Sequence, residues 1–165
     1  MAKISKLLLF NPISILIKDI DCNFENIVKV MNIFEFKQIV MRIIFLQKDS
    51  SLIVFIKNKG LKFIIKQCSD NYVVVFVIVP YSLFNNILKM AINEKADDIC
   101  IFNLFDLTTW DIYQHNTSIN YLVSKGVTDV ALFVVFDART LIINANKSLV
   151  RPKEMCEKVN EICFD

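Results

Sequence analysis

The chain has 165 residues, of which 55% are hydrophobic, and it contains only two glycines and three prolines. This composition excludes an intrinsically disordered protein, and the length is enough for a domain with a full hydrophobic core. The net charge of +2 hides an asymmetry, because residues 1–95 carry 13 Lys/Arg against 7 Asp/Glu and residues 96–165 carry 6 against 10. Two interpretations stay open: complementary surfaces that dock within or between molecules, or a basic half that faces a polyanion.

The sequence predicts neither a membrane-spanning segment nor a signal peptide. The longest uncharged stretch, residues 71–88, is interrupted by Pro80, Asn85 and Asn86, which argues against a bilayer span. The apolar run at residues 7–10 is too short for a signal peptide and lacks a small-residue cleavage site. We therefore expect a cytoplasmic protein.

The cysteines and the single histidine form no catalytic or metal-binding pattern. The five cysteines show no CxxC spacing, and His115 alone cannot complete the usual zinc ligand sets. Glycine-rich phosphate loops and the GxSxG and HExxH motifs are also missing. We expect free thiols in a reducing compartment and no cofactor.

Taken in chain order, the first elements predicted are two strands and a long helix. Residues 6–10 and 14–20 have the apolar composition of strands. Residues 24–46 place apolar side chains three or four positions apart, which predicts one helix. The final part of this segment, residues 39–45, also fits a strand.

Three more strands and a second helix follow. Residues 52–57, 61–66 and 71–79 are apolar runs, and Gly60 marks a hairpin turn between the first two. The amphipathic pattern of residues 81–92 then predicts a helix that crosses one face of this antiparallel meander.

The order strand, strand, helix, three strands and helix resembles the roadblock/longin group of profilin-like domains, most clearly over residues 52–92. The resemblance implies a five-stranded antiparallel sheet flanked by helices. It also implies a dimeric scaffold that serves small GTPases or trafficking and motility machinery. We therefore predict an α+β fold in which residues 1–95 form a roadblock/longin-like unit.

Residues 96–165 predict an additional α/β extension. Its expected elements are strands at 98–105, 127–136 and 138–145, a helix within 108–126 that includes at least the part from Ser118, and a last helix that begins at Pro152. The extension is either an incomplete second repeat, a permuted or swapped element, or a distinct subdomain packed on the first unit. The sequence leaves these alternatives open.

We predict a non-enzymatic interaction module that self-associates as a homodimer and binds a protein partner such as a small GTPase. The contact surface is expected on the edge strand 52–57 and on the helix 24–46, whose phenylalanines cannot all face one core. The predicted interface residues are Phe36, Met41, Phe45 and Lys57.

An alternative function is a Mg²⁺-dependent nuclease or phosphohydrolase. Asp106, Asp137 and Asp21 each follow a hydrophobic strand in the sequence, and carboxylates gathered at strand ends are typical of Mg²⁺ sites. Aspartate after a strand is also a common turn former or helix cap.

A second alternative is a nucleic-acid-binding protein of a virus or plasmid, since the abundance of Ile, Asn, Lys and Phe is typical of an AT-rich coding sequence. Lys57, Lys59, Lys62 and Lys66 cluster on one predicted hairpin and would suit a polyanion. Solvated edge lysines that block aggregation explain the same pattern.

Overall fold

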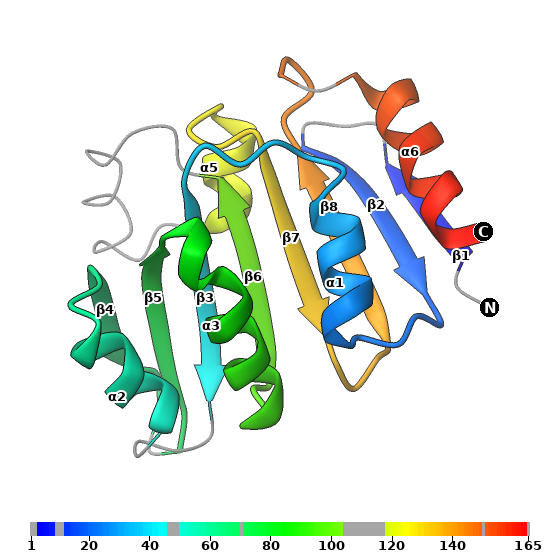
Figure 1. Cartoon of the computed structure of the whole chain (residues 1–165). Helices are drawn as coiled ribbons and strands as arrows, with labels where there is room; N and C mark the ends of the chain where they lie inside the picture. Colours follow the sequence, from blue (N-terminus) through cyan, green and yellow to red (C-terminus); the bar gives the residue numbers. More distant parts are fainter. Residues whose placement is uncertain are drawn as a thin grey trace.

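The computed structural model of the chain describes residues 3–8, 12–45, 50–69, 71–103, 118–149 and 151–164. These residues form one open antiparallel sheet of eight strands with helices on both faces (Figure 1). The strands are β1 (Lys3–Leu8), β2 (Ile13–Lys18), β3 (Ile39–Phe45), β4 (Phe63–Gln67), β5 (Val73–Val79), β6 (Asp98–Asn103), β7 (Val130–Val135) and β8 (Thr140–Ala145). The helices are α1 (Phe24–Met31), α2 (Ser51–Asn58), α3 (Tyr81–Asn93), α5 (Ile119–Ser124) and α6 (Pro152–Phe164). Across the sheet the strands follow the order β1-β2-β8-β7-β6-β3-β5-β4.

Four of these helices, α1, α2, α3 and α6, cover one face of the sheet, which we call the first face (Figure 1). Their buried side chains, such as Ile27, Leu52, Phe84 and Met155, pack with alternate residues of the strands and form the main core. The opposite, second face carries the short helix α5, which packs on a smaller cluster that includes Phe102. The two faces therefore differ strongly in how much helix covers them.

Residues 39–103 form a split β-α-β arrangement. β3 leads through α2 to β4, and β5 returns between β3 and β4 before α3 leads to β6 on the other side of β3. The resulting strand order β6-β3-β5-β4, with both helices on the first face, is the ferredoxin-like topology.

The remaining strands repeat this arrangement in permuted order. β8 leads to α6, and the series β1, β2, α1 and β7 would complete a second unit with the strand order β7-β8-β2-β1. The chain interrupts this series twice: α6 and β1 lie at opposite ends of the chain but contact each other, and the first unit is inserted between α1 and β7. The two units meet where β6 pairs with β7 around Cys100 and Phe133, so the sheet has an approximate two-fold symmetry.

The long helix predicted for residues 24–46 is wrong. α1 ends at Met31, and residues Ile39–Phe45 form β3 at the centre of the sheet, between β5 and β6. The strand was one of the two readings open for this segment. Apolar residues occupy six of the seven positions of β3, including Val40 and Ile44 on the second face, so the alternation typical of a strand is hidden.

The strand predicted for residues 52–57 is also wrong, because this run forms α2. Ser50 caps the helix, since its hydroxyl oxygen accepts hydrogen bonds from the backbone N–H of Leu52 at 3.1 Å and of Ile53 at 3.4 Å. The carboxylate of Glu94 accepts a further bond from the N–H of Leu52 at 2.9 Å. These contacts satisfy N–H groups that the first helical turn leaves open.

The predicted α+β class, with an antiparallel sheet flanked by helices, is confirmed, but the five-stranded sheet is wrong. β2 pairs with β8 and β6 pairs with β3, so strands from both ends of the chain join the same sheet. The division into units 1–95 and 96–165 stays a prediction. The helix expected from Ser118 is confirmed as α5, whereas residues 108–117 lie outside the described residues.

Candidate functional site

Three of the four predicted interface residues lie inside the molecule. Phe36, Met41 and Phe45 belong to the main core, and their side chains are 6%, 0% and 3% exposed. The expectation that Phe36 and Phe45 lie on an exposed helix face is therefore wrong, since β3 and the segment before it direct them under the helices. Lys57 is exposed on α2. Lys57 thus remains on the surface, while the other three serve the fold.

Lys57 borders one outer edge of the sheet, which we call the β4 edge. β4 pairs with β5 on one side, and no described strand pairs with its other side. Ile53, Lys57, Ile65, Gln67 and Val73 line a hollow of about 240 Å³ between α2 and this edge. The side chain of Ile65, in the middle of β4, is 38% exposed.

A second candidate surface is the second face of the sheet. Directly paired residues share a face, and their pairing defines a central row that crosses seven strands. The central row consists of Ile64, Phe76, Arg42, Cys100, Phe133, Ile142 and Leu16. All of these side chains except the buried Cys100 are half-buried. An apolar row with one arginine in its middle is unusual for the solvent side of an antiparallel sheet.

Arg42 and Asp98 form the polar centre of this face. Nη2 of Arg42 lies 3.5 Å from Oδ1 of Asp98, and the guanidinium lies over the ring of Phe133, 5.7 Å from its centroid. Nε of Arg42 is buried and has no hydrogen-bond partner. The pair is thus loosely joined, and the guanidinium retains donor capacity.

Burial raises the pKa values of two groups near Arg42, namely Asp98 and Cys100. Desolvation raises the pKa of Asp98 above its ordinary value, and the charge of Arg42 opposes this shift. Complete burial raises the pKa of the Cys100 thiol far more strongly. Cys100 therefore stays protonated, and no activated nucleophile arises at the centre of the face.

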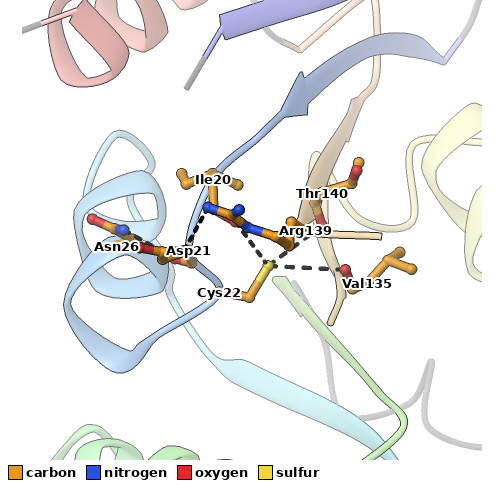
Figure 2. A network of polar contacts seen from close by, with 7 residues as sticks. All are labelled: Ile20, Asp21, Cys22, Asn26, Val135, Arg139 and Thr140. Atoms are coloured by element: carbon orange, nitrogen blue, oxygen red, sulfur yellow. Dashed lines mark hydrogen bonds and ion pairs between the residues drawn. The ribbon is translucent and has the colours of Figure 1, made fainter. Parts of the chain in front are cut away.

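A polar network surrounds Cys22, which lies between β2 and α1 and next to the β7–β8 turn. Figure 2 shows the thiol directed at the carbonyl oxygens of Ile20, Val135 and Thr140, which lie 3.8, 3.9 and 3.8 Å away. Burial, the largest cause, raises the pKa of this thiol. A protonated thiol among carbonyl groups joins the β7–β8 turn to the start of α1 and is unsuited to nucleophilic attack.

The strand-end aspartates give no metal site within the described residues. Asp21 binds Arg139, whose Nη2 lies 2.7 Å from its Oδ1 (Figure 2). Asp137 is exposed in the turn after β7, and Asp106 lies outside the described residues. No three His, Cys, Asp or Glu side chains of the described residues are grouped so that they could hold a metal ion. The metal hypothesis stays a prediction that depends on Asp106.

Sequence comparison gives no family assignment: no family model matches the chain, and no curated protein matches it. Among the described helices, none combines the length and apolar character needed to cross a membrane.

The residues that sequence reasoning missed are Arg42, Asp98, Phe133 and Ile65. Arg42 carried a signal, because it is the single arginine of residues 1–95 and stands inside an apolar run.

Proposed function

We propose that the chain is a non-enzymatic protein-interaction module that self-associates through the second face of its sheet. The observation that carries this proposal is the central row, in which half-buried apolar side chains surround Arg42. The short helix α5 is the one helix of the described residues that packs on this face. A face of this composition is suited to a second protein layer.

The geometry of the face supports a partner that is itself a sheet. Two antiparallel sheets commonly pack face to face with their apolar side chains interdigitated. Phe76 and Phe133 stand on either side of Arg42 in the central row, so a facing sheet would bury both rings. Aromatic rings contribute strongly to protein interfaces because they bury a large area with few rotatable bonds.

The charges at the centre support a second copy of the same chain as this partner. In a two-fold contact a residue of one protomer meets a different residue of its partner, and the reverse contact forms at the same time. Arg42 of each protomer would then meet Asp98 of the other. The long ion pair within one chain and the 23% exposure of the Arg42 side chain leave the guanidinium able to donate to this additional partner.

Light scattering after size-exclusion chromatography tests the proposal. The wild-type chain should have the mass of a dimer, and Phe133→Gln should shift the mass toward the monomer, because a polar side chain replaces a ring of the central row. Tyr81→Gln is the matched control, since Tyr81 is 60% exposed on α3, away from this face. A wild-type monomer, or an unchanged dimer in Phe133→Gln with a folded circular-dichroism spectrum, contradicts the proposal.

The resemblance to roadblock and longin domains supports this proposal only through their shared architecture, an antiparallel sheet flanked by helices. A small GTPase is the protein partner that the resemblance implies.

The same light-scattering experiment with added Mg²⁺ examines the alternative, a Mg²⁺-dependent nuclease or phosphohydrolase. A cytoplasmic location is part of the proposal and is supported by the free thiols of Cys22, Cys68, Cys100 and Cys156.

A further inference from the structure

We propose that the β4 edge binds an extended acidic segment of a partner protein, which adds to the sheet as an antiparallel strand next to β4. This site lies along the outer edge of β4 and not at the centre of the second face, so the inference goes beyond the self-association proposed above. Three observations support it: the direction of the backbone groups of β4, the hollow under α2 and the distribution of lysines.

The backbone of β4 exposes alternate N–H and C=O groups on its outer side. Toward β5, the N–H of Ile78 donates to the carbonyl of Lys62 at 3.0 Å, and the N–H of Cys68 donates to the carbonyl of Tyr72 at 3.0 Å. Hydrogen bonding alternates along an antiparallel ladder. The backbone N–H and C=O groups of the even-numbered residues of β4 therefore point toward β5. The backbone groups of Phe63, Ile65 and Gln67 therefore point away from the sheet and can pair with an added strand.

The side chains of the same residues shape a specificity pocket. Ile65 and Gln67 point to the first face, where they line the hollow of about 240 Å³ together with Ile53 and Lys57 of α2. A strand added beside β4 would place one of its alternate side chains over this hollow. In recognition by strand addition, the main-chain hydrogen bonds supply affinity and the side-chain pockets supply specificity. The hollow favours an apolar side chain, because Ile53 and Ile65 form its walls.

The charges around the edge select an acidic strand. Residues 50–69 contain four lysines, at positions 57, 59, 62 and 66, and no acidic residue. Lys57 lies on the first-face side of the hollow, whereas Lys62 and Lys66, which alternate with Phe63, Ile65 and Gln67, lie on the second-face side. Carboxylates on the second-face side of an added strand would therefore meet Lys62 and Lys66, while Lys57 adds positive charge beside the hollow.

The same lysines argue against a second copy at this edge. Antiparallel pairing of β4 with β4 of another molecule would bring Lys62 and Lys66 of one chain diagonally across from the same lysines of the other. Like charges at this spacing disfavour pairing, and edge lysines are a common means by which proteins prevent self-association. An acidic strand would instead place carboxylates near these lysines, so the interaction across the edge would be attractive.

The experiment measures fluorescence anisotropy of a labelled peptide of alternating aspartate and valine, titrated with the full chain. Two N-methylated versions of the peptide are the decisive controls, because methylation removes the N–H groups of one edge of the strand and leaves the protein unchanged. Methylation on the edge that faces β4 should weaken binding about tenfold or more, since several main-chain bonds are lost. Methylation on the opposite edge should leave the affinity within about twofold.

Variants of the chain test the charge and the pocket. Lys62→Glu with Lys66→Glu should weaken binding of the aspartate peptide about tenfold, and the same peptide with lysine in place of aspartate should bind more weakly than the original. Lys125→Glu, at the residue that follows α5, is the matched control. The proposal would be overturned by an equal loss of affinity with both methylation patterns or by equal binding of the lysine peptide. It would also be overturned if a single-stranded oligonucleotide bound more tightly than the aspartate peptide. The oligomeric mass plays no part in these readouts, so failure here is distinguishable from failure of the proposed self-association.

Discussion

Arg42 and Asp98 lie on the neighbouring central strands β3 and β6, with the guanidinium nitrogen Nη2 of Arg42 3.5 Å from the carboxylate oxygen Oδ1 of Asp98. Their side chains are 23% and 35% exposed. The chain thus keeps Arg42 in the otherwise apolar central row and Asp98 beside that row, where neither charge is fully solvated nor closely paired. Partly buried charges contribute little to stability unless they have good partners, and this supports the proposal that Arg42 and Asp98 meet a second copy of the chain.

The burial of Met41 predicts a structural role for a residue that the sequence places in an interface. Met41→Ala should lower the free energy of unfolding by about 3 kcal/mol, because the truncated side chain leaves a cavity in a fully buried strand. Val54→Ala, at a 56% exposed position of α2, should change it by less than about 0.5 kcal/mol. Urea denaturation measures both values, and equal effects would show that Met41 is not a core residue.

The cap of α2 predicts a difference between two adjacent serines. Ser50 accepts two backbone hydrogen bonds at the start of the helix, whereas the exposed Ser51 contacts the carboxylate of Glu94 without capping. Ser50→Ala should therefore cost about 1 kcal/mol of stability. Ser51→Ala should cost distinctly less in the same urea titration. The opposite ranking would contradict the assignment of Ser50 as the cap.

The raised pKa of Asp129 predicts a pH-dependent contribution to stability. Burial is the largest cause of the shift, and hydrogen bonds, first that from Asn103, oppose it. The folded chain therefore binds this proton more tightly than the unfolded chain. This contribution is fully present below the unfolded pKa, near 3.8, and is lost as the pH rises through the folded value.

Asp129→Asn, which stays neutral, removes this contribution. The wild type should lose stability relative to Asp129→Asn as the pH rises from about 3 to about 7. Urea denaturation across this range measures the difference, and an NMR titration of the Asp129 carboxyl group checks the direction of the shift. A carboxyl group that titrates below pH 3.8 would contradict this prediction.

The burial of the thiols predicts their order of reaction with iodoacetamide in the folded chain. Among the four cysteines whose side chains are described, Cys68 is exposed and should be modified first, whereas Cys100 is buried and has a raised pKa, so it should remain unmodified until the chain unfolds. Peptide mass spectrometry after timed labelling gives the order. Rapid labelling of Cys100 under native conditions would show that the second face opens at this strand.

The errors in the predicted fold came from segments in which tertiary contacts outweigh local pattern. Residues Ile39–Phe45 are apolar at nearly every position, and β3 has strand neighbours on both sides, so its pattern does not alternate. The run in α2 is rich in β-branched residues, which favour strands, yet Ser50 and the distant Glu94 stabilise its first turn. The strands β2, β5, β7 and β8 were predictable because they alternate or end at clear turns.

The candidate surfaces were predictable only in part. The lysines near the β4 edge were visible in the sequence, but the outward direction of the Ile65 backbone follows from the pairing of β4 with β5. Arg42, Asp98 and Phe133 are far apart in the sequence, and only the strand order brings them together. Local patterns carry no information about such an order.

The most direct test of self-association through the second face uses two charge-reversed variants, Arg42→Glu and Asp98→Arg. Each variant alone places like charges at the centre of the face and should have the mass of a monomer in light scattering. An equimolar mixture should form a heterodimer, because the two substituted positions then carry opposite charges and meet across the interface, while the native Asp98 of one chain meets the native Arg42 of the other. A mixture that stays monomeric although each variant is folded and the wild type is a dimer, or single variants that dimerise as well as the wild type, would contradict the account.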